Sequence, residues 1–204
     1  FIFTPEQIDK NKYKSDHAIQ FMIESIDELK KDLKDIGLSL SLFCGVQEDV
    51  IKNIIKSHDI DAVYFNMDYT PYAKSRDNKI KNICNNYDTS CKSFYDYYLF
   101  SPYNILTNDE NAYTKFTPFY NKALSYIDDI NEPKYINAKQ LKHIESKTIG
   151  TYTLSYTKNK NLNVNGGRKK ALKILKNIGS FKHYEQNRDI INVSTTHLSA
   201  YLKH

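Results

Sequence analysis

Hydrophobic residues recur along the first half of the chain with two alternating spacings. A period of three to four residues from His17 to Ile36, closed by Gly37, predicts an amphipathic helix with a glycine stop. Two more helical patterns follow, at 47–59 and at about 70–86. Short apolar runs predict strands at 1–3, 38–43, 60–65 and just after Cys91.

This alternation of strands and helices predicts right-handed crossovers and an α/β fold. We expect a doubly wound, mostly parallel sheet of the five-stranded type with helices on both faces. We expect the first strand of this sheet to be missing, since residues 1–3 already resemble the middle of a strand. A later helical pattern begins at Gly166, with an apolar face that comprises Ala171, Leu172, Ile174, Leu175 and Ile178.

The chain therefore divides into three predicted parts. Residues 1–130 form the α/β domain, and residues 131–165 form an interdomain linker, because no hydrophobic period is sustained there. Residues 166–204 begin an all-helical domain. This last part is too short for a core of its own, so we expect it to be incomplete.

Composition narrows the class of protein. A hydrophobic fraction of 40% with 26% charged residues is typical of a globular domain and argues against disorder. The net charge of +5 is spread along the chain, which favours a solvated lysine-rich surface over a polyanion site. The three cysteines form no CxxC pair and the histidines lack ligand spacing, so we predict no metal site and a reducing compartment.

Hydropathy gives no sign of a membrane partner. No apolar stretch approaches the ~18 residues that a membrane-spanning helix requires, and the first residues do not form a signal peptide. We expect an intracellular, soluble protein of the cytoplasm or nucleus.

Segments that follow strands are the places to look for ligands in a parallel sheet. They are 4–8, 44–49 and 66–77, and none contains the glycine pattern of a dinucleotide site or a P-loop. Arg76 and Asp77 lie side by side in the third of these segments. A structural ion pair is the favoured interpretation, and a ligand contact is the alternative.

Residues 107–120, "TNDENAYTKFTPFY", combine a polar start with an aromatic cluster around Pro118. We expect Pro118 to open a helix from Phe119. One interpretation is a packed loop that seals the domain. The other is a flat aromatic pocket for a ring-shaped ligand, with Asn108, Asp109 or Glu110 bonding the polar edge of the ring.

A run of hydroxyl side chains, from Ser194 to Thr196, precedes "HLSAYL" near the end of the chain. One of the hydroxyls can cap a helix whose first N–H groups point outward, and such a helix start can bind a diphosphate. Taken alone, an ordinary helix cap is the commoner explanation.

Five stretches together, "FTPEQ", "VYFNMDYTPYAKSRD", "YTKFTPFY", "GGRKKAL" and "YEQNRDIINVSTTHLSAYL", resemble the DNA photolyase and cryptochrome family in wording and order. The resemblance implies an N-terminal α/β domain with a folate or deazaflavin antenna chromophore, followed by a helical domain that binds FAD. It also implies FAD contacts from Tyr184, Thr195, Thr196, His197, Leu198 and Ser199, and antenna contacts near Asn108, Asp109 and Glu110. His197 stands where the family often has arginine, so phosphate binding would be weaker.

The resemblance implies a truncated photolyase whose family reaction is light-driven repair of cyclobutane pyrimidine dimers with FAD. Most of the helical domain would lie after His204, and no catalytic residue is assigned within the chain. We therefore expect no activity from the isolated chain. A separate polypeptide could supply the missing part, and damaged DNA would be a partner only then. The alternatives are a non-enzymatic chromophore- or nucleotide-binding module of the cryptochrome kind and a remnant without a ligand.

Overall fold

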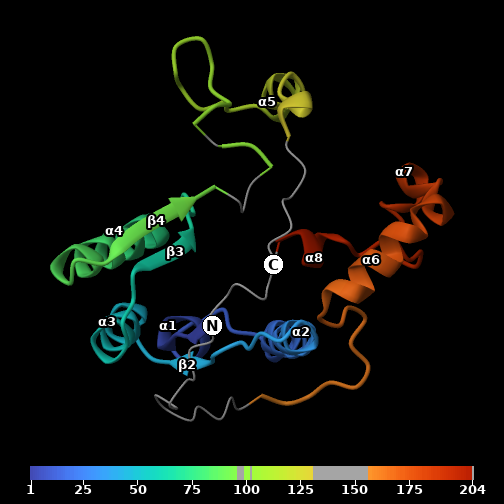
Figure 1. The fold of residues 1–204 in the computed structure, drawn as a ribbon. Coiled ribbons are helices and arrows are strands. Elements are labelled where there is room, and N and C mark those ends of the chain that lie inside the picture. The colour runs from blue at the N-terminus through green and yellow to red at the C-terminus, as the bar shows by residue number, and fades with distance from the viewer. Residues whose placement is uncertain (96–98, 102, 131–155, 204) are drawn as a thin grey trace. The chain divides into compact units, whose positions relative to one another are not determined.

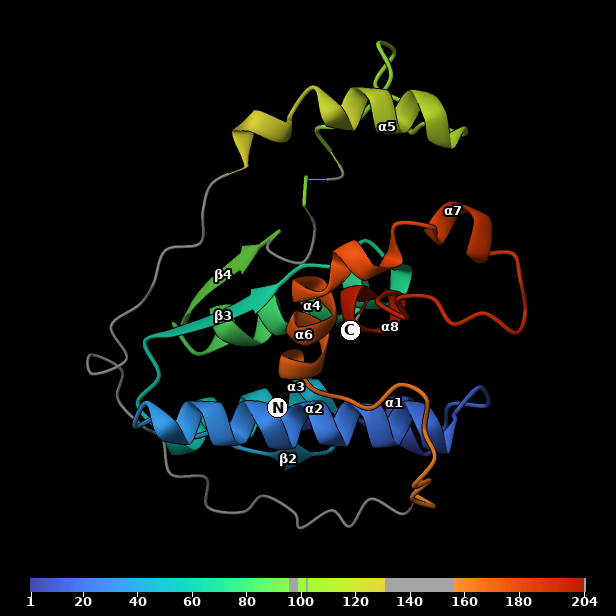
Figure 2. The same ribbon diagram turned by 90° about the vertical axis from the view of Figure 1, so that its right-hand side faces the viewer.

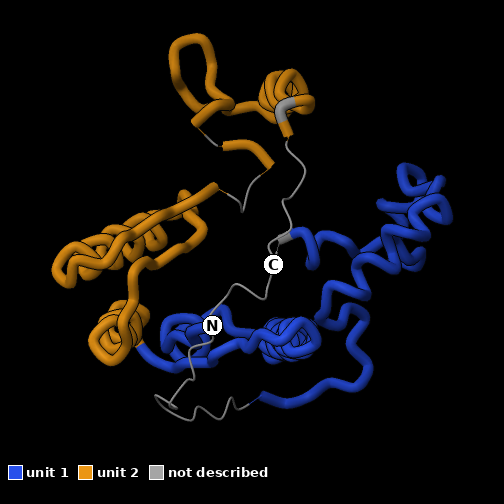
Figure 3. The backbone as a smooth tube through the Cα atoms, viewed as in Figure 1, with its two compact units in different colours: residues 1–45, 137–204 blue, residues 46–136 orange. Residues whose placement is uncertain are grey.

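The computed structural model describes residues 1–95, 99–101, 103–130 and 156–203. The chain forms two compact units (Figure 3), residues 1–45 with 137–204 and residues 46–136. The boundaries of these units differ from those of the three predicted parts. The predicted division into an α/β domain, a linker and a helical region stays a prediction. Most of the predicted linker, residues 131–155, lies outside the described residues.

The first unit begins with a small parallel strand pair and a long helix. Its first elements are β1 (Ile2–Phe3), α1 (Pro5–Ile8), α2 (Asp16–Asp35) and β2 (Phe43–Cys44). The core of this unit contains Phe3, Ile8, Ile19 and Ile26, with Leu40 and Leu42 packed against them. Most of the strand predicted over 38–43 thus lies outside β2, although Leu40 and Leu42 pack on this core. Since β1 offers only two residues for pairing, Ile2 opposite Phe43 and Phe3 opposite Cys44, the ladder is short.

The same unit ends in short helices. They are α6 (Arg168–Lys176), the 3-10 turn η3 (Ile178–Phe181), α7 (Tyr184–Asn187) and α8 (Ser199–Lys203). The helical pattern predicted from Gly166 is present as α6. No residue of α6 is buried, and Leu175 and Ile178 are about half exposed.

The second unit contains α3 (Gln47–Ser57), β3 (Ala62–Asn66), α4 (Pro71–Asn86), β4 (Ser90–Phe94), α5 (Phe116–Leu124) and the 3-10 turn η1 (Ile127–Asp129) (Figure 1). Strands β3 and β4 pair in parallel over five residues each, from Ala62 opposite Ser90 to Asn66 opposite Phe94. The core comprises Ile55 of α3 with Ile80 and Cys84 of α4, and Val63, Phe65 and Cys91 pack on it from the strands.

The structure confirms the α/β class, with parallel strands and helices in both units. The described strands form two separate parallel pairs, β1 with β2 and β3 with β4. In the second pair, Tyr64 and Phe94 are exposed, and their rings stack at 6.2 Å between centroids.

One helix begins earlier than predicted. Helix α5 starts at Phe116 rather than Phe119, so Pro118 is the third residue of its first turn. Proline is tolerated there because the first N–H groups of a helix have no partner within the helix. Within the part of the chain that the structure describes, none of the helices combines the length and the apolar character needed to cross a membrane.

Candidate functional site

The residues that the resemblance assigns to FAD lie in two places in the first unit. Tyr184 opens α7 and is 45% exposed, whereas Thr195 to Ser199 lie before and at the start of α8. Figures 1 and 2 both show α7 apart from α8. The structure therefore brings the residues from 195 to 199 together but does not bring Tyr184 to them.

Local hydrogen bonds shape the hydroxyl run. The Leu198 N–H donates to Thr196 Oγ1 at 3.4 Å, and Ser194 Oγ lies 3.2 Å from His197 Nε2. His197 has a positive φ of 51°, which is uncommon for a residue other than glycine. The helix that follows begins at Ser199 and has five residues, so its dipole is small. A hydroxyl does accept a backbone N–H here, as predicted, but in a turn before the helix.

The residues predicted for the antenna pocket form a tight exposed turn in the second unit. The Glu110 N–H donates to the Thr107 carbonyl at 2.9 Å, and the Asn111 N–H donates to Thr107 Oγ1 at 3.1 Å. Asn108, Asp109 and Glu110 are all exposed. This turn is closed by its own hydrogen bonds, and these three side chains line no pocket that we identify in the described residues.

The neighbouring aromatic cluster packs on itself. The rings of Phe116 and Tyr120 stack with 5.7 Å between centroids, and Tyr113 meets Phe119 edge-on at 6.5 Å. Phe116 is 73% exposed. The three rings of this cluster that belong to α5, those of Phe116, Phe119 and Tyr120, are exposed, and the aromatic pocket stays a prediction.

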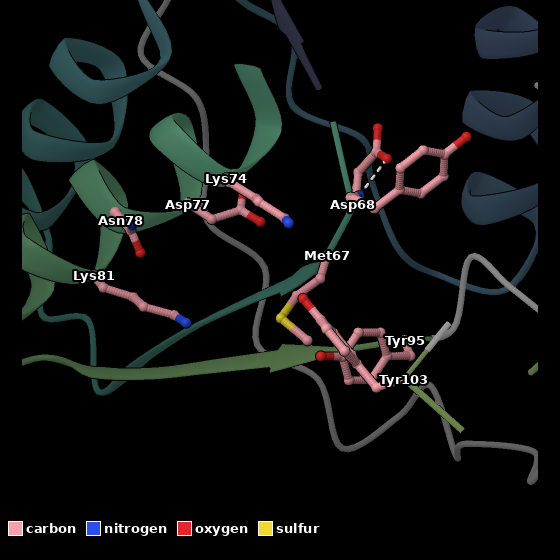
Figure 4. A pocket seen from close by; sticks show the side chains of 9 residues that line it. Met67, Asp68, Lys74, Asp77, Asn78, Lys81, Tyr95 and Tyr103 are labelled. Carbon is pink, nitrogen blue, oxygen red and sulfur yellow. Dashed lines mark hydrogen bonds between the residues drawn. The ribbon is translucent and has the colours of Figure 1, made fainter. Parts of the chain in front are cut away.

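A pocket of about 260 Å³ lies elsewhere in the second unit, at the carboxyl ends of β3 and β4 (Figure 4). Its strand side is lined by Met67, Asp68, Tyr69, Tyr95 and Tyr103, and its helix side by Lys74, Asp77, Asn78 and Lys81 of α4. A ligand position beyond the carboxyl ends of strands is the one that parallel sheets favour.

The loop between β3 and α4 is built to start a helix at the pocket. Thr70 caps α4 by accepting the Ala73 N–H at 3.3 Å, and Pro71 follows at the first helical position. Asp68 accepts the Tyr69 N–H at 2.6 Å, which fixes the turn. Asp77 and Asn78 each lie three or four positions from both Lys74 and Lys81, so the four lining residues of α4 share one side of the helix.

Charge and aromatic area face each other across the pocket. Asp77 is 5% exposed and accepts from Arg76, with Nη2 at 2.6 Å and Nε at 2.8 Å from Oδ1. Lys74 and Lys81 reach from the same helix, while the rings of Tyr95 and Tyr103 meet edge-on at 5.9 Å (Figure 4). The pocket can thus hold a flat ring against tyrosine and an anionic group against lysine.

Sequence reasoning found this site only in part. The segment 66–77 was singled out because it follows a strand, and the predicted ion pair between Arg76 and Asp77 is confirmed. The sequence does not single out Tyr95 and Tyr103, because the aromatic residues are denser at 113–120 and an aromatic pocket was predicted there instead. The number of residues that separates these two tyrosines from β3 does not indicate that they lie near its end. The five-residue register between β3 and β4 is what brings Tyr95 to this edge.

Parallel strands joined by helices, with a pocket at the carboxyl ends of β3 and β4, define a protein of the α/β class. The family model described as DNA photolyase matches residues 1–135, and the chain therefore belongs to the DNA photolyase family. A deoxyribodipyrimidine photo-lyase from Buchnera aphidicola subsp. Acyrthosiphon pisum is 29% identical over 99% of this chain and 44% of its own length. Cryptochrome-1 of Aedes aegypti is 28% identical over 65% of this chain and 24% of its own length.

Solved structures agree with this assignment. An archaeal photolyase from Sulfolobus tokodaii, described with two FAD molecules and a novel light-harvesting cofactor, is 29% identical and superposes with a TM-score of 0.69, covering 100% of this chain and 44% of its own. A class III photolyase from Agrobacterium tumefaciens, at 22% identity and a TM-score of 0.76, shows the same fold over 98% of this chain and 43% of its own. The chain thus spans less than half the length of these relatives.

Proposed function

We propose that the pocket between α4 and the ends of β3 and β4 binds an antenna chromophore, and that the chain acts as the light-harvesting part of a photolyase-type protein. The single observation that carries the proposal is the pairing of two tyrosine rings with two lysines around one cavity. A cavity of about 260 Å³ is near the lower end for small-molecule sites, so a ring system would enter it and the rest of the ligand would lie outside.

The chemical class of the ligand follows from the donors. Lys74 and Lys81 supply cationic donors for a carboxylate or phosphate, and Asn78 and Asp77 can hydrogen-bond the polar edge of a ring. A folate and a flavin nucleotide each combine a flat ring with an anionic tail, and a deazaflavin supplies a flat ring of the same kind. The light-harvesting cofactor described for the Sulfolobus photolyase supports this class.

The test is an absorption spectrum of the purified chain after incubation with FAD, a reduced folate or a deazaflavin, followed by desalting. We expect one of these ligands to be retained, and Tyr95→Ala or Lys74→Ala to reduce its retention by at least about tenfold. Tyr13→Ala is the matched control, because Tyr13 is 83% exposed and lies in the other unit. A chain that retains none of the three, or variants that retain as much as the control, would overturn the proposal.

A second function concerns repair itself. We infer that FAD, held partly by Thr195 to Ser199, drives dimer repair only when another polypeptide completes the helical domain. The exposed apolar side chains of Leu172, Leu175 and Ile178 support this, since they offer such a polypeptide a surface to pack on. Light-dependent reversal of pyrimidine dimers is expected with a complementing helical fragment and not with the chain alone. Repair by the chain alone would contradict this.

A further inference from the structure

The segment from Tyr156 to Lys170 runs along α2 in the first unit and is tied to it through its backbone (Figure 2). Polar side chains recur on α2 at every fourth position, so each lies beside the one before it and together they form a stripe along the helix. They are Asp16, Gln20, Glu24, Glu28 and Asp32. Each of them bonds a residue between 157 and 169.

Two contacts at the centre of this stripe fix the register. Gln20, which is 1% exposed, accepts the Asn159 N–H at 2.8 Å and donates to the Asn159 carbonyl at 3.1 Å. Glu24 accepts the Gly166 N–H at 2.8 Å and also accepts from Gln20 at 2.9 Å. Because both hydrogen bonds from Gln20 go to the backbone of Asn159, a shift of the segment by one position would break both of them.

Gly166 is required by the closeness of this contact. A Cβ atom at Gly166 would overlap the Phe21 carbonyl oxygen and lie 2.7 Å from Ser25 Oγ. Gly167 has a φ of 114° and donates its N–H to Ser25 Oγ at 3.0 Å. Two consecutive backbone units therefore touch α2 where no side chain fits.

The end of the chain is anchored at the same place. The Tyr201 hydroxyl donates to the Asn165 carbonyl at 2.8 Å, and the Tyr201 ring lies 5.3 Å from the ring of Phe21. The Tyr201 N–H in turn donates to the Leu198 carbonyl at 3.0 Å. The hydroxyl run before α8 is thus linked through Tyr201 to residues that α2 holds.

We propose that this stripe of α2 is a positioning site: Gln20 and Glu24 fix the register of residues 157–169, and Tyr201 carries that register to residues 195–199. The first half of the proposal does not depend on any ligand. The second half gains its functional meaning from the proposed flavin contacts, on which it rests.

Titration of Glu24 provides a readout that packing alone would not give. Burial raises the pKa of Glu24, but hydrogen bonds from Gln20 and Gly166 and the charges of Lys170 and Lys158 outweigh it, so the pKa lies below 4.5. Burial raises the pKa of Tyr201, and the negative charges of Glu24 and Glu28 raise it further. The attachment of residues 157–169 to α2 should therefore be complete above pH 4.5, and it should weaken as the pH falls through the lowered pKa of Glu24.

The experiment is hydrogen exchange, followed residue by residue by NMR on the full chain. Gly166→Ala and Glu24→Ala should each speed exchange of the Asn159, Gly166 or Gly167 amides by about tenfold or more. Gly179→Ala is the matched control, because a Cβ there meets nothing within 4 Å. Glu24→Gln keeps an acceptor oxygen and should restore part of the protection while removing the share of the pH dependence that the Glu24 carboxylate contributes; the carboxylates of Asp16, Glu28 and Asp32 contact the same segment and are unchanged.

The readout for the second half is exchange at the Tyr201 and Leu202 amides, which needs no flavin. It should quicken in Gly166→Ala and in Tyr201→Phe, while the β3 and β4 amides stay protected and show that the variants are folded. Unchanged exchange at 159–167 in Glu24→Ala and Gly166→Ala would overturn the whole proposal. Faster exchange there with unchanged exchange at 201 and 202 would overturn the positioning of the C-terminal segment alone.

Discussion

Replacing Ile80 by alanine tests whether the core beneath the pocket supports α4. Ile80 is 4% exposed and packs with Ile55 and Cys84, and Val63 and Phe65 pack on the same cluster from β3. Truncation of a buried isoleucine to alanine costs about 2–5 kcal/mol, and we expect about 3 kcal/mol here because α4 has one solvent face and can relax inward. That is a large fraction of the roughly 5–15 kcal/mol that stabilises a domain.

The assay is urea unfolding of the full chain, followed through NMR signals of β3 and β4 so that the second unit is read separately. Ile80→Val should lower the free energy of unfolding by about 1 kcal/mol, because it removes less buried volume than Ile80→Ala does. Ile191→Ala is the control for the same chemical change, since Ile191 is fully exposed. A cost below about 1 kcal/mol for Ile80→Ala, or one equal to that of the control, would refute the packing argument.

Two further predictions concern α4. Thr70→Ala should destabilise the second unit by about 1 kcal/mol in urea, because the Ala73 N–H loses its acceptor, whereas Thr70→Ser should not. Equal stability of the two variants would contradict the capping role. Burial and a hydrogen bond with Cys91 raise the pKa of Cys84 from 9.0 to about 11, so stability should be complete below pH 9 and fall as the pH rises toward 11. Cys84 should also resist alkylation at pH 8 until urea unfolds the chain, as mass spectrometry would detect, and rapid labelling of the folded chain would refute this.

The helices at 17–36, 47–59 and 70–86 were predicted to within two residues, whereas most of the strand expected over 38–43 did not form. The period from His17 to Ile36 corresponds to α2 at Asp16–Asp35, because a helix needs only its own apolar stripe and a stop such as Gly37 with its φ of 79°. A strand needs a partner. Residues 38–43 have strand character, but only Phe43 belongs to β2 because β1 is two residues long.

Only the part of the candidate pocket that one segment of the chain supplies could be predicted from the sequence. Residues 66–77 carry part of it, and their place after a strand can be read from the apolar run before them. The tyrosines opposite cannot be chosen in this way, because the chain has 17 tyrosines and several of them are in aromatic clusters. Selecting Tyr95 requires the register of β3 against β4, which is a property of the folded unit.

The C-terminal segment shows the complementary case. The family resemblance assigned ligand contacts to residues 195–199 directly, yet it gave no hint of what holds them in place. Those groups lie on α2, 139 positions before Asn159 in the case of Gln20. The pocket and the stripe of polar residues on α2 belong to different compact units. A substitution at one of these two sites should therefore leave the other site unchanged. Glu24→Ala should leave chromophore retention unchanged, and Tyr95→Ala should leave exchange at Gly166 unchanged, so a variant that disturbs both would show that the two sites share a structural support.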